Sequence, residues 1–381
     1  MKIVLAFDSY KNCLSSPEIC RIIRSEIIRN APDWQVVSMP LGDGGEGTAQ
    51  AIASASGGVM KELTVCGPLS KPVTAQYGIL PDNSAVFEMA SASGIELISA
   101  DERNPMSATT YGTGELIRHI VTNEKCSRLT IGIGGSATVD GGIGMLQALG
   151  AEFFDENGRL LPAPASGYDI AEIRKISVDK VLPELAQCRI KIASDVTNPL
   201  CGSNGAAQVF APQKGANASM VEQLENNLKN FGTLSVTSGI ADNFNAPGDG
   251  AAGGLGFALR NYLHAESSSG AELVLDLLDF DNTISDAALV ITGEGCSDRQ
   301  TALGKLPAVV AEHARRKNVP VILLSGALGK GSEKLAPLFC AVLSLSSAPC
   351  SLEQAIGDCE KNLIRMSNAI VNILKLQREV K

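Results

Sequence analysis

The two ends of the chain share one alternation of short hydrophobic runs and helical segments, which the long middle does not continue. A hydrophobic run of a few residues bounded by turn residues is typical of a buried strand. Strands that alternate with helices predict a doubly wound parallel sheet. The strands predicted for this sheet are residues 2–7, 35–40, 288–292, 320–325 and 339–345.

Helical patterns separate these runs. Ser15-Ser16-Pro17-Glu18 can form a capping box with proline in the first turn of a helix. The helix that follows has Glu26 toward one edge of its apolar stripe. The stripe itself consists of Ile19, Ile22, Ile23 and Ile27. The other helices of this part are predicted at residues 46–55, 307–317 and 352–376.

The middle of the chain has a different rhythm and predicts a second α/β region. Two short alternating runs, 74–80 and 85–89, flank Pro-Asp-Asn-Ser, and this combination is typical of a β-hairpin. Further strands are expected at 128–133 and 189–193.

The length of 381 residues exceeds what one ordinary core accommodates and suits two domains. We expect residues 1–60 and 284–381 to form one α/β domain and residues 61–283 to form a domain inserted into it. A small-molecule site commonly lies where two domains meet. The cleft between the two domains is therefore the expected active site.

The charge balance bears on the partners of the protein. Lys and Arg number 32, Asp and Glu number 41, and the net charge of −9 is not offset by any basic cluster. Nucleic-acid binding relies on clustered cations, so no nucleic-acid partner is expected. No run approaches the roughly 20 apolar residues of a membrane span, and the apolar start is too short for a signal peptide. We expect a cytoplasmic protein without a membrane partner.

Cysteine and histidine usage argues against two kinds of site. The ten cysteines include no C-x-x-C pair and mostly occupy apolar segments, so we expect small buried side chains. Only three histidines are present, which gives little support to a His-ligated zinc site or a Ser-His-Asp triad.

Polar, glycine-rich loops follow the strands of the terminal parts. The loops are Asp8-Ser9-Tyr10-Lys11, residues 42–48, Gly293-Glu294-Gly295 and Ser325-Gly326. Any one of them alone is an ordinary turn between a strand and a helix. Ligands gather at the carboxyl ends of parallel strands, and three of these loops carry carboxylates. Together they predict a site at this edge of the sheet.

Two loops of the middle region add to this set. Residues 131–142 place glycines and hydroxyls between a strand and a helix, where free backbone N–H groups favour an anion. The loop matches neither of the standard nucleotide-binding glycine fingerprints. Residues 194–202 follow a strand and present Asp195 beside an Asn-Pro turn, which the carboxylate could equally well brace.

Phosphoryl transfer requires an anion cradle, a divalent cation and a group that orients or deprotonates the acceptor. The glycine loops could supply the cradle. The carboxylate candidates for the other two tasks are Asp43, Asp195, Glu294 and Asp298, and the cations for an acidic acceptor are Lys11, Arg299 and Lys305. The residues themselves thus indicate an α/β enzyme that handles phosphate.

At these loops the sequence resembles the bacterial type 1 glycerate kinase family. The matching stretches run almost end to end: residues 8–11, 41–48, 88–94, 110–115, 132–142, 195–202, 212–215, 250–256 and 292–295. The resemblance implies a flavodoxin-like domain built from both chain ends with an inserted α/β domain. It also implies phosphorylation of D-glycerate by ATP with Mg²⁺, on the 2-hydroxyl, giving 2-phosphoglycerate.

The resemblance suggests roles for particular residues. Asp195 is expected to orient or deprotonate the glycerate hydroxyl, although Asp8 could take that role, and Lys11 to pair with phosphate or with the glycerate carboxylate. Asp43 and Glu294 are the expected magnesium ligands. The residues expected to bind substrate or phosphate are Gly134, Gly135, Ser136, Asn198, Arg299 and Lys305.

One departure from the family pattern concerns the acceptor. Cys296 stands where the family commonly has Arg, while Asp298, Gln300 and Thr301 match. A kinase of another small hydroxy acid or sugar acid is therefore an alternative. Two further alternatives are a dinucleotide-dependent reductase and a non-catalytic binding protein. Against the reductase, this chain lacks the acidic residue that usually follows the second strand of a dinucleotide-binding fold. The sequence is compatible with an oligomer.

Overall fold

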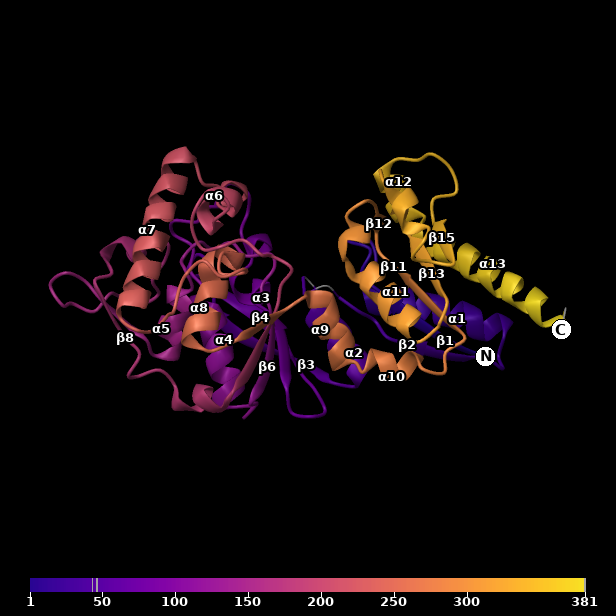
Figure 1. Cartoon of the computed structure of the whole chain (residues 1–381), viewed down its shortest axis with the longest axis horizontal. Coiled ribbons are helices and arrows are strands. Elements are labelled where there is room, and N and C mark those ends of the chain that lie inside the picture. Colours follow the sequence, from indigo (N-terminus) through magenta and orange to yellow (C-terminus); the bar gives the residue numbers. More distant parts are fainter. Residues whose placement is uncertain (43, 46, 380–381) are drawn as a thin grey trace. The chain divides into compact units, whose positions relative to one another are not determined.

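The computed structural model describes residues 1–42, 44, 45 and 47–379. The chain divides into two compact units, which are described separately. Unit 1 comprises Met1–Asp43, Gln50–Gly57 and Ala271–Lys381, and unit 2 comprises Gly44–Ala49 and Gly58–Gly270. Both chain ends belong to unit 1, as the indigo and yellow segments of Figure 1 show. Unit 1 resumes at Ala271 and not at 284, because two helices that precede its third strand belong to it. The cleft expected between the domains stays a prediction.

Unit 1 is built on a five-stranded parallel sheet in the order β15-β13-β11-β1-β2. Numbered along unit 1, this order is 2-1-3-4-5, the flavodoxin-like arrangement, so the predicted fold class is confirmed. Each of the five predicted strands is present within two residues of its expected ends. They are β1 (Lys2–Phe7), β2 (Gln35–Ser38), β11 (Leu289–Gly293), β13 (Val321–Ser325) and β15 (Ala341–Ser344).

Helix α1 (Ser16–Asn30) begins as its sequence predicts. The Glu18 carboxylate accepts hydrogen bonds from the backbone N–H and the hydroxyl of Ser15, at 2.8 and 2.6 Å. The predicted isoleucine stripe is buried in a core that it shares with β1 and the terminal helix. Glu26 is 2% exposed and so lies within the buried face instead of at its edge. Arg29, one turn away, donates to its carboxylate at 2.6 Å, which compensates part of the cost of burying the charge.

The terminal helix differs from its prediction. Residues 352–376 form two helices, α12 (Leu352–Gly357) and α13 (Cys359–Glu379), instead of one. Asp358 separates them, with φ −93° and ψ 3°, and its backbone N–H caps α12. The remaining elements of unit 1 are α9 (Gly270–Leu277, from its second residue), α10 (Phe280–Ile284), β12 (Cys296–Ser297), η6 (Thr301–Leu303), α11 (Leu306–Arg316), β14 (Ala327–Leu328) and η7 (Ser332–Leu335), together with most of α2 (Thr48–Ser56).

Unit 2 contains a six-stranded sheet in the order β10-β9-β6-β5-β4-β3. The first four strands in this order are parallel, and β4 pairs antiparallel with both β5 and β3. The predicted hairpin is therefore confirmed as β4–β5. The strands are β3 (Val59–Cys66), β4 (Pro72–Ile79), β5 (Ala85–Glu88), β6 (Arg128–Gly132), β9 (Arg189–Ala193) and β10 (Glu266–Ser268).

Helices and a small two-stranded sheet complete unit 2. Its long helix, α7 (Ala218–Thr237), is capped by Asn217, whose side chain accepts a hydrogen bond from the N–H of Met220 at 3.0 Å. The other elements are α3 (Ala90–Ser93), η1 (Ile95–Leu97), α4 (Tyr111–Thr122), α5 (Ile143–Leu149), β7 (Glu152–Phe154), η2 (Asp169–Glu172), β8 (Lys175–Ser177), η3 (Pro183–Gln187), α6 (Ala206–Phe210), η4 (Pro212–Lys214), η5 (Ala251–Gly254) and α8 (Leu255–Tyr262).

The expectation that the cysteines are buried side chains is met only in part. The cysteines are free thiols, but only Cys20, Cys126 and Cys359 are buried, and three others are exposed. Across the described residues, no helix combines the length and the apolar character that crossing a membrane requires.

A buried histidine joins three helices of unit 1. His313 on α11 is 5% exposed, and its two ring nitrogens lie 2.7 Å from Asp281 on α10 and 2.9 Å from Glu272 on α9. Because both neighbours are carboxylates, the arrangement suits an imidazolium that donates from both nitrogens. Burial lowers the pKa of His313, but the hydrogen bonds and charges of Asp281 and Glu272 together outweigh burial and raise the pKa above its ordinary value.

The stability of unit 1 should consequently depend on pH through His313. A raised folded-state pKa contributes stability that is complete below the unfolded pKa, about 6.5 for histidine, and is lost as pH rises through the folded pKa. We expect the loss of unfolding free energy in His313→Asn to be larger at about pH 5.5 than at about pH 8.5. Urea unfolding at both pH values measures it, with exposed His264→Asn as the control. A loss that is equal at the two pH values would contradict this account.

Candidate active site

The carboxyl ends of the unit 1 strands bring the predicted loops together. The backbone N–H of Asp8, directly after β1, donates to the carbonyl of Gly293 at the end of β11 at 3.0 Å. The N–H of Gly326, directly after β13, donates to the carbonyl of Glu294 at 3.0 Å. Asp8, Glu294 and Gly326 are thus neighbours along one edge of the sheet, as the loop pattern predicts.

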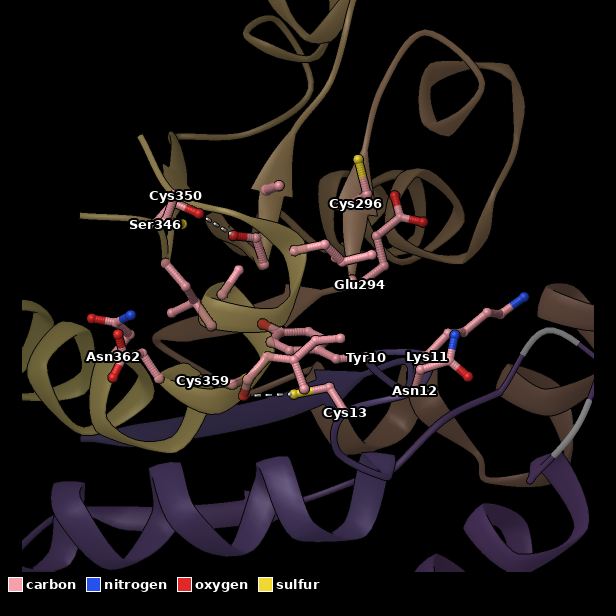
Figure 2. Close-up of a pocket in the computed structure, with 18 of the residues that line it drawn as sticks. Tyr10, Lys11, Asn12, Cys13, Glu294, Cys296, Ser346, Cys350, Cys359 and Asn362 are labelled. Carbon is pink, nitrogen blue, oxygen red and sulfur yellow. Dashed lines mark hydrogen bonds between the residues drawn. The ribbon is translucent and has the colours of Figure 1, made fainter. Parts of the chain in front are cut away.

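A cavity of about 620 Å³ opens at this edge (Figure 2). Asp8, Lys11, Glu294 and Lys305, all predicted site residues, line it. Apolar side chains from the last third of the chain form much of the remaining wall, among them Leu345, Leu352, Ile356 and Cys359. The volume lies within the range of small-molecule sites. No motif in residues 345–362 predicts their participation, because they contribute apolar and small polar side chains without a recognisable pattern.

Glu294 is held firmly at the cavity wall. It is 8% exposed, and one carboxylate oxygen, Oε1, accepts hydrogen bonds from Ser297 at 2.9 Å and from Thr301 at 2.6 Å. The other oxygen, Oε2, lies 3.8 Å from the Nζ atom of Lys305. Two hydroxyl donors therefore orient the carboxylate, while Oε2 retains lone pairs for a ligand.

The predicted cations differ in position. Lys11 is exposed and lines the cavity, and Lys305 lies 3.8 Å from both Glu294 and Asp298. Arg299 is exposed but is not among the cavity-lining residues, and its backbone N–H donates to the carbonyl of Lys330 at 3.2 Å. Lys11 and Lys305, and not Arg299, are the predicted cations that this cavity collects.

Cys296 lies on the cavity wall beside Glu294 (Figure 2). Its thiol is exposed, and its strand β12 pairs in parallel with β14. Burial of part of the group, followed by the charges of Asp298 and Glu294, raises the pKa of this thiol. The side chain is therefore a neutral thiol at neutral pH and supplies no positive charge at the cavity wall.

Unit 2 has its own sheet edge with predicted site residues. In the sheet register, Gly132 at the end of β6 pairs with Glu88 of β5 on one side and Ala193 of β9 on the other. Gly44 approaches the same edge, because a Cβ on Gly132 would lie 2.5 Å from the carbonyl oxygen of Gly44. The N–H of Ala49 donates to the Glu88 carboxylate at 2.7 Å. Parts of three predicted segments therefore converge here: Gly44 and Ala49, residues 132–136, and residues 194–195.

A buried carboxylate, that of Asp140, holds the glycine loop after β6 in place through hydrogen bonds. Asp140 is fully buried and accepts hydrogen bonds from the N–H and hydroxyl of Thr110 at 2.8 and 2.7 Å and from the N–H of Gly142 at 3.1 Å. Gly135, with φ +72°, occupies a backbone conformation that side chains disfavour. Gly134 and Gly135 remain exposed while Ser136 is buried, so the loop presents backbone to a cavity of about 430 Å³.

Two basic residues of this cavity, Lys214 and Arg103, were not among the predicted site residues. Lys214, in η4, is 3% exposed, and its Nζ atom donates to the hydroxyl of Ser136 and the carbonyl of Thr138, both at 2.7 Å. Arg103 lines the same cavity. Lys214 stands in the Pro-Gln-Lys-Gly block of the family resemblance, which was the one signal available from the sequence.

Asp195 and Asn198 both follow β9, but their side chains differ in the hydrogen bonds that they make. The Asp195 side chain is exposed, and Oδ1 accepts a hydrogen bond from the N–H of Gly270 at 3.2 Å. Its neighbour Val196 lines the 430 Å³ cavity. The Asn198 amide donates to the carbonyl of Asn204 at 2.8 Å and so closes its own loop. Asp195 is thus available to a ligand at this edge, whereas Asn198 has a structural partner.

The predicted metal ligands have different outcomes. Asp43 lies outside the described residues. Glu294 offers one oxygen, as above, and among the described residues no cluster of three or more His, Cys, Asp or Glu side chains is arranged to hold a metal ion. One or two carboxylates combined with substrate phosphates is the usual arrangement for Mg²⁺, so Glu294 fits a site completed by its ligands.

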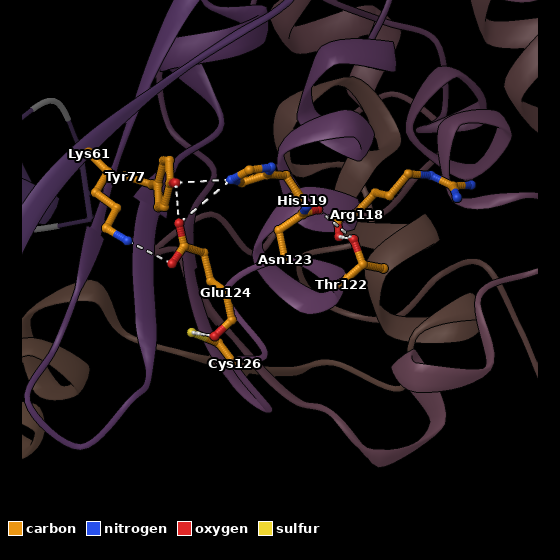
Figure 3. A network of polar contacts seen from close by, with 8 residues as sticks. All are labelled: Lys61, Tyr77, Arg118, His119, Thr122, Asn123, Glu124 and Cys126. Atoms are coloured by element: carbon orange, nitrogen blue, oxygen red, sulfur yellow. Dashed lines mark hydrogen bonds and ion pairs between the residues drawn. The ribbon is translucent and has the colours of Figure 1, made fainter.

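A third polar cluster in unit 2 joins β3, β4 and the end of α4 (Figure 3). The Glu124 carboxylate accepts hydrogen bonds from Lys61 at 2.7 Å and from the hydroxyl of Tyr77 at 2.8 Å. His119 contacts the same hydroxyl at 3.2 Å. Burial, followed by the hydrogen bond to Glu124, raises the pKa of Tyr77. Since each group is engaged with another, we interpret the cluster as a structural tie.

The fold is that of an α/β protein, and each of the two sheet edges carries polar loops of the kind that bind anionic small molecules. Comparison with known proteins supports this class. The family model described as the glycerate kinase family matches residues 3–375. The chain therefore belongs to the glycerate kinase family, and the protein is a kinase.

Individual relatives cover almost the whole chain. Glycerate 2-kinase of Escherichia coli (strain K12) is 41% identical over 99% of this chain and 98% of its own length. Glycerate kinase of Bacillus subtilis (strain 168) is 40% identical over 99% of both chains. A crystal structure assigned as glycerate kinase 2 of Salmonella typhimurium LT2 has a TM-score of 0.90, 40% identity, and covers 100% of this chain and 99% of its own.

The structural interpretation of the Tyr77 cluster predicts a separation of stability from activity. Tyr77→Phe should lower the unfolding free energy by about 1 kcal/mol, because it removes a part-buried hydrogen bond to the Glu124 carboxylate together with the contact to His119. Kinase turnover should stay at the native level. Thermal unfolding and a coupled ATP assay on the same preparation measure both, with Tyr168→Phe, an exposed tyrosine, as the control. A stable variant with lost turnover would contradict the structural role.

Proposed function

We propose that the protein transfers the γ-phosphate of ATP to the 2-hydroxyl of D-glycerate, giving 2-phosphoglycerate and ADP. The observation that carries this proposal is the convergence, in a chain of the glycerate kinase family, of an exposed aspartate and a glycine loop at one sheet edge. The 2-hydroxyl is supported by the E. coli relative, which is named a 2-kinase.

Unit 2 offers the groups that the acceptor requires. Asp195 is exposed, and among the described residues its Oδ1 accepts one weak hydrogen bond, at 3.2 Å, so its carboxylate can accept the proton of the glycerate hydroxyl. The oxygen of the glycerate hydroxyl then bonds to the γ-phosphorus of ATP, while the bond between this phosphorus and the bridging oxygen breaks and ADP leaves. The backbone of Gly134 and Gly135, with Ser136, faces a cavity in which the anion can lie.

Unit 1 offers charge of both signs. Lys11 and Lys305 line the 620 Å³ cavity and can pair with phosphate or with the glycerate carboxylate. Asp8, 8% exposed with Oδ1 bonded to the N–H of Ser9, is the second candidate for the base. Arg299 and Asn198 stay weaker proposals, because neither side chain lines a described cavity.

Magnesium would be held by Oε2 of Glu294 together with Asp43 and phosphate oxygens. Bound there, the ion would neutralise phosphate charge during transfer. Ser297 and Thr301 orient the Glu294 carboxylate beforehand, so little reorganisation is needed on binding.

The base assignment predicts a selective loss of turnover. Asp195→Asn keeps the shape of the side chain but cannot accept a proton, so kcat should fall by about 100-fold or more with a small change in KM. Coupled ADP release measures the rate, phosphorus NMR of the product identifies the phosphorylated hydroxyl, and exposed Asp242→Asn is the control. A folded Asp195→Asn variant with near-native turnover would remove Asp195 as base and turn attention to Asp8→Asn.

The metal assignment predicts a changed Mg²⁺ requirement. Asp43→Asn and Glu294→Gln should each raise the Mg²⁺ concentration that gives half-maximal rate, since each removes an anionic oxygen ligand. Titration of activity with Mg²⁺ at saturating ATP measures it, and Asp242→Asn again serves as the control. An unchanged Mg²⁺ profile in both variants, with native thermal stability, would contradict the assignment.

Cys296 favours a second candidate function, phosphorylation of another small hydroxy acid or sugar acid. The neutral thiol on the cavity wall replaces the arginine common in the family, so an acceptor carboxylate would lose one partner there. A panel of hydroxy and sugar acids, compared by kcat/KM in the native protein and in Cys296→Arg, separates the two functions. A higher kcat/KM for another acid than for D-glycerate in the native protein would support the second.

A further inference from the structure

Lys214 is a buried cation without a buried counter-charge in contact with it. Its side chain is 3% exposed, yet its Nζ atom contacts two neutral oxygens, the Ser136 hydroxyl and the Thr138 carbonyl. In the part of the chain that the structure describes, no carboxylate lies within ion-pair distance of this Nζ atom. A buried ammonium that lacks a paired anion is costly, so its retention calls for a reason beyond stability.

Arg103 adds a second incompletely paired cation. Its Nε atom is buried and has no hydrogen-bond partner among the described residues. Arg103 and Lys214 line the same 430 Å³ cavity with Gly134, Gly135 and Ser136. A guanidinium offers two parallel donors to a carboxylate or phosphate, and an ammonium with two of its three donors used retains one.

Gly215 brings these two cations together. It has φ +97°, and a Cβ at this position would lie 2.3 Å from the carbonyl oxygen of Arg103. Only glycine allows the backbone after Lys214 to approach Arg103 this closely. The Pro-Gln-Lys-Gly block is therefore explained as a unit: the turn η4 buries Lys214, and Gly215 places it against the segment that carries Arg103.

The charges around the cavity favour an anionic ligand. Asp140 lies beneath the glycine loop and is the carboxylate whose charge supports that of Lys214, while Glu96, which also lines the cavity, is exposed to solvent. Burial, opposed by the charge of Asp140, lowers the pKa of Lys214 to about 7. An arriving anion would favour the protonated lysine and would supply the charge partner that the free protein lacks.

We infer that Lys214 and Arg103 bind an oxyanion of the substrates, the carboxylate of glycerate or a phosphate of the nucleotide, at the glycine loop of unit 2. Gly215 acts as a positioning residue. The inference rests on the proposed function for the identity of the ligands, but the site itself is tested by binding, without turnover.

Lys214→Met and Arg103→Gln are the variants that test this site, with exposed Lys229→Met as the matched control. Calorimetry measures the binding of D-glycerate alone and of ADP alone to each protein. We expect both variants to lose about 10- to 100-fold in affinity for one of the two ligands, as the loss of a charge-assisted hydrogen bond implies. A loss confined to D-glycerate identifies the carboxylate, and a loss confined to ADP identifies the phosphate.

Thermal unfolding separates binding from a structural role. Because Lys214→Met removes an unpaired buried charge, its melting temperature should equal or exceed that of the native protein. The affinity of the native protein for the chosen ligand should also rise as pH falls from about 8.5 to about 6, and this dependence should vanish in Lys214→Arg, which stays charged.

Native affinity for both ligands in both variants would overturn the inference. So would a lower melting temperature in Lys214→Met with an equal loss for both ligands, which is the signature of a structural brace. If the native protein binds ligand through Lys214 but does not phosphorylate D-glycerate, the proposed function fails while the anion site stands.

Discussion

The pairing of β1 with β11 is the interaction on which unit 1 depends. It joins segments from opposite ends of the chain, with Ile3 to Phe7 in register with Leu289 to Gly293, and the Thr292 hydroxyl donates to the Ala6 carbonyl at 2.6 Å. The pairing places β1 inside the sheet, between β2 and β11. Its parallel register also sets the position of Asp8 beside Glu294, so the same contact that completes the fold assembles the cavity edge.

In unit 2, parallel strands likewise bring loops together at one sheet edge, and backbone contacts take the place of side-chain contacts there. Its parallel strands end at Glu88, Gly132 and Ala193, and glycines let the neighbouring loops approach to contact distance. A Cβ on Gly132 or Gly215 would collide with a carbonyl oxygen. The high glycine content, 38 of 381 residues, therefore has a local reason at these two positions: Gly132 admits the backbone of Gly44, and Gly215 admits the backbone of Arg103.

Much of the fold was predictable because its signals are local. Hydrophobic runs, a capping box and a hairpin turn located the five strands of unit 1, the start of α1 and the β4–β5 pair. The break at Asp358 was missed because the apolar pattern continues on both sides of it, although Gly357, the last residue of α12, is a residue type that favours helix ends. Burial of Glu26 was missed for a related reason, because helix periodicity cannot register an arginine one turn later that pairs with the carboxylate.

The residues of the candidate site likewise fall into those that the sequence could predict and those that it could not. Asp8, Lys11, Glu294 and the glycine loop follow strands directly, so strand prediction was enough to find them. Lys214 and Arg103 follow no strand, and they meet only because Gly215 lets distant segments touch. Sequence reasoning named Lys11, Arg299 and Lys305 instead, because these three cations lie in the polar loops that carry the candidate carboxylates.

For an acidic chain that binds two anionic substrates, burial offers an advantage that surface cations lack. With a net charge of −9 the surface is expected to repel anions weakly, and surface lysines are screened by salt. A lysine held in the interior by Ser136 and Thr138, with a buried Asp140 nearby, acts in a lower dielectric where one charge interacts more strongly. Burial without a contacting anion lowers the pKa of Lys214, because it disfavours the charged form. A bound anionic ligand favours the protonated lysine, and the positive charge of that lysine in turn holds the ligand.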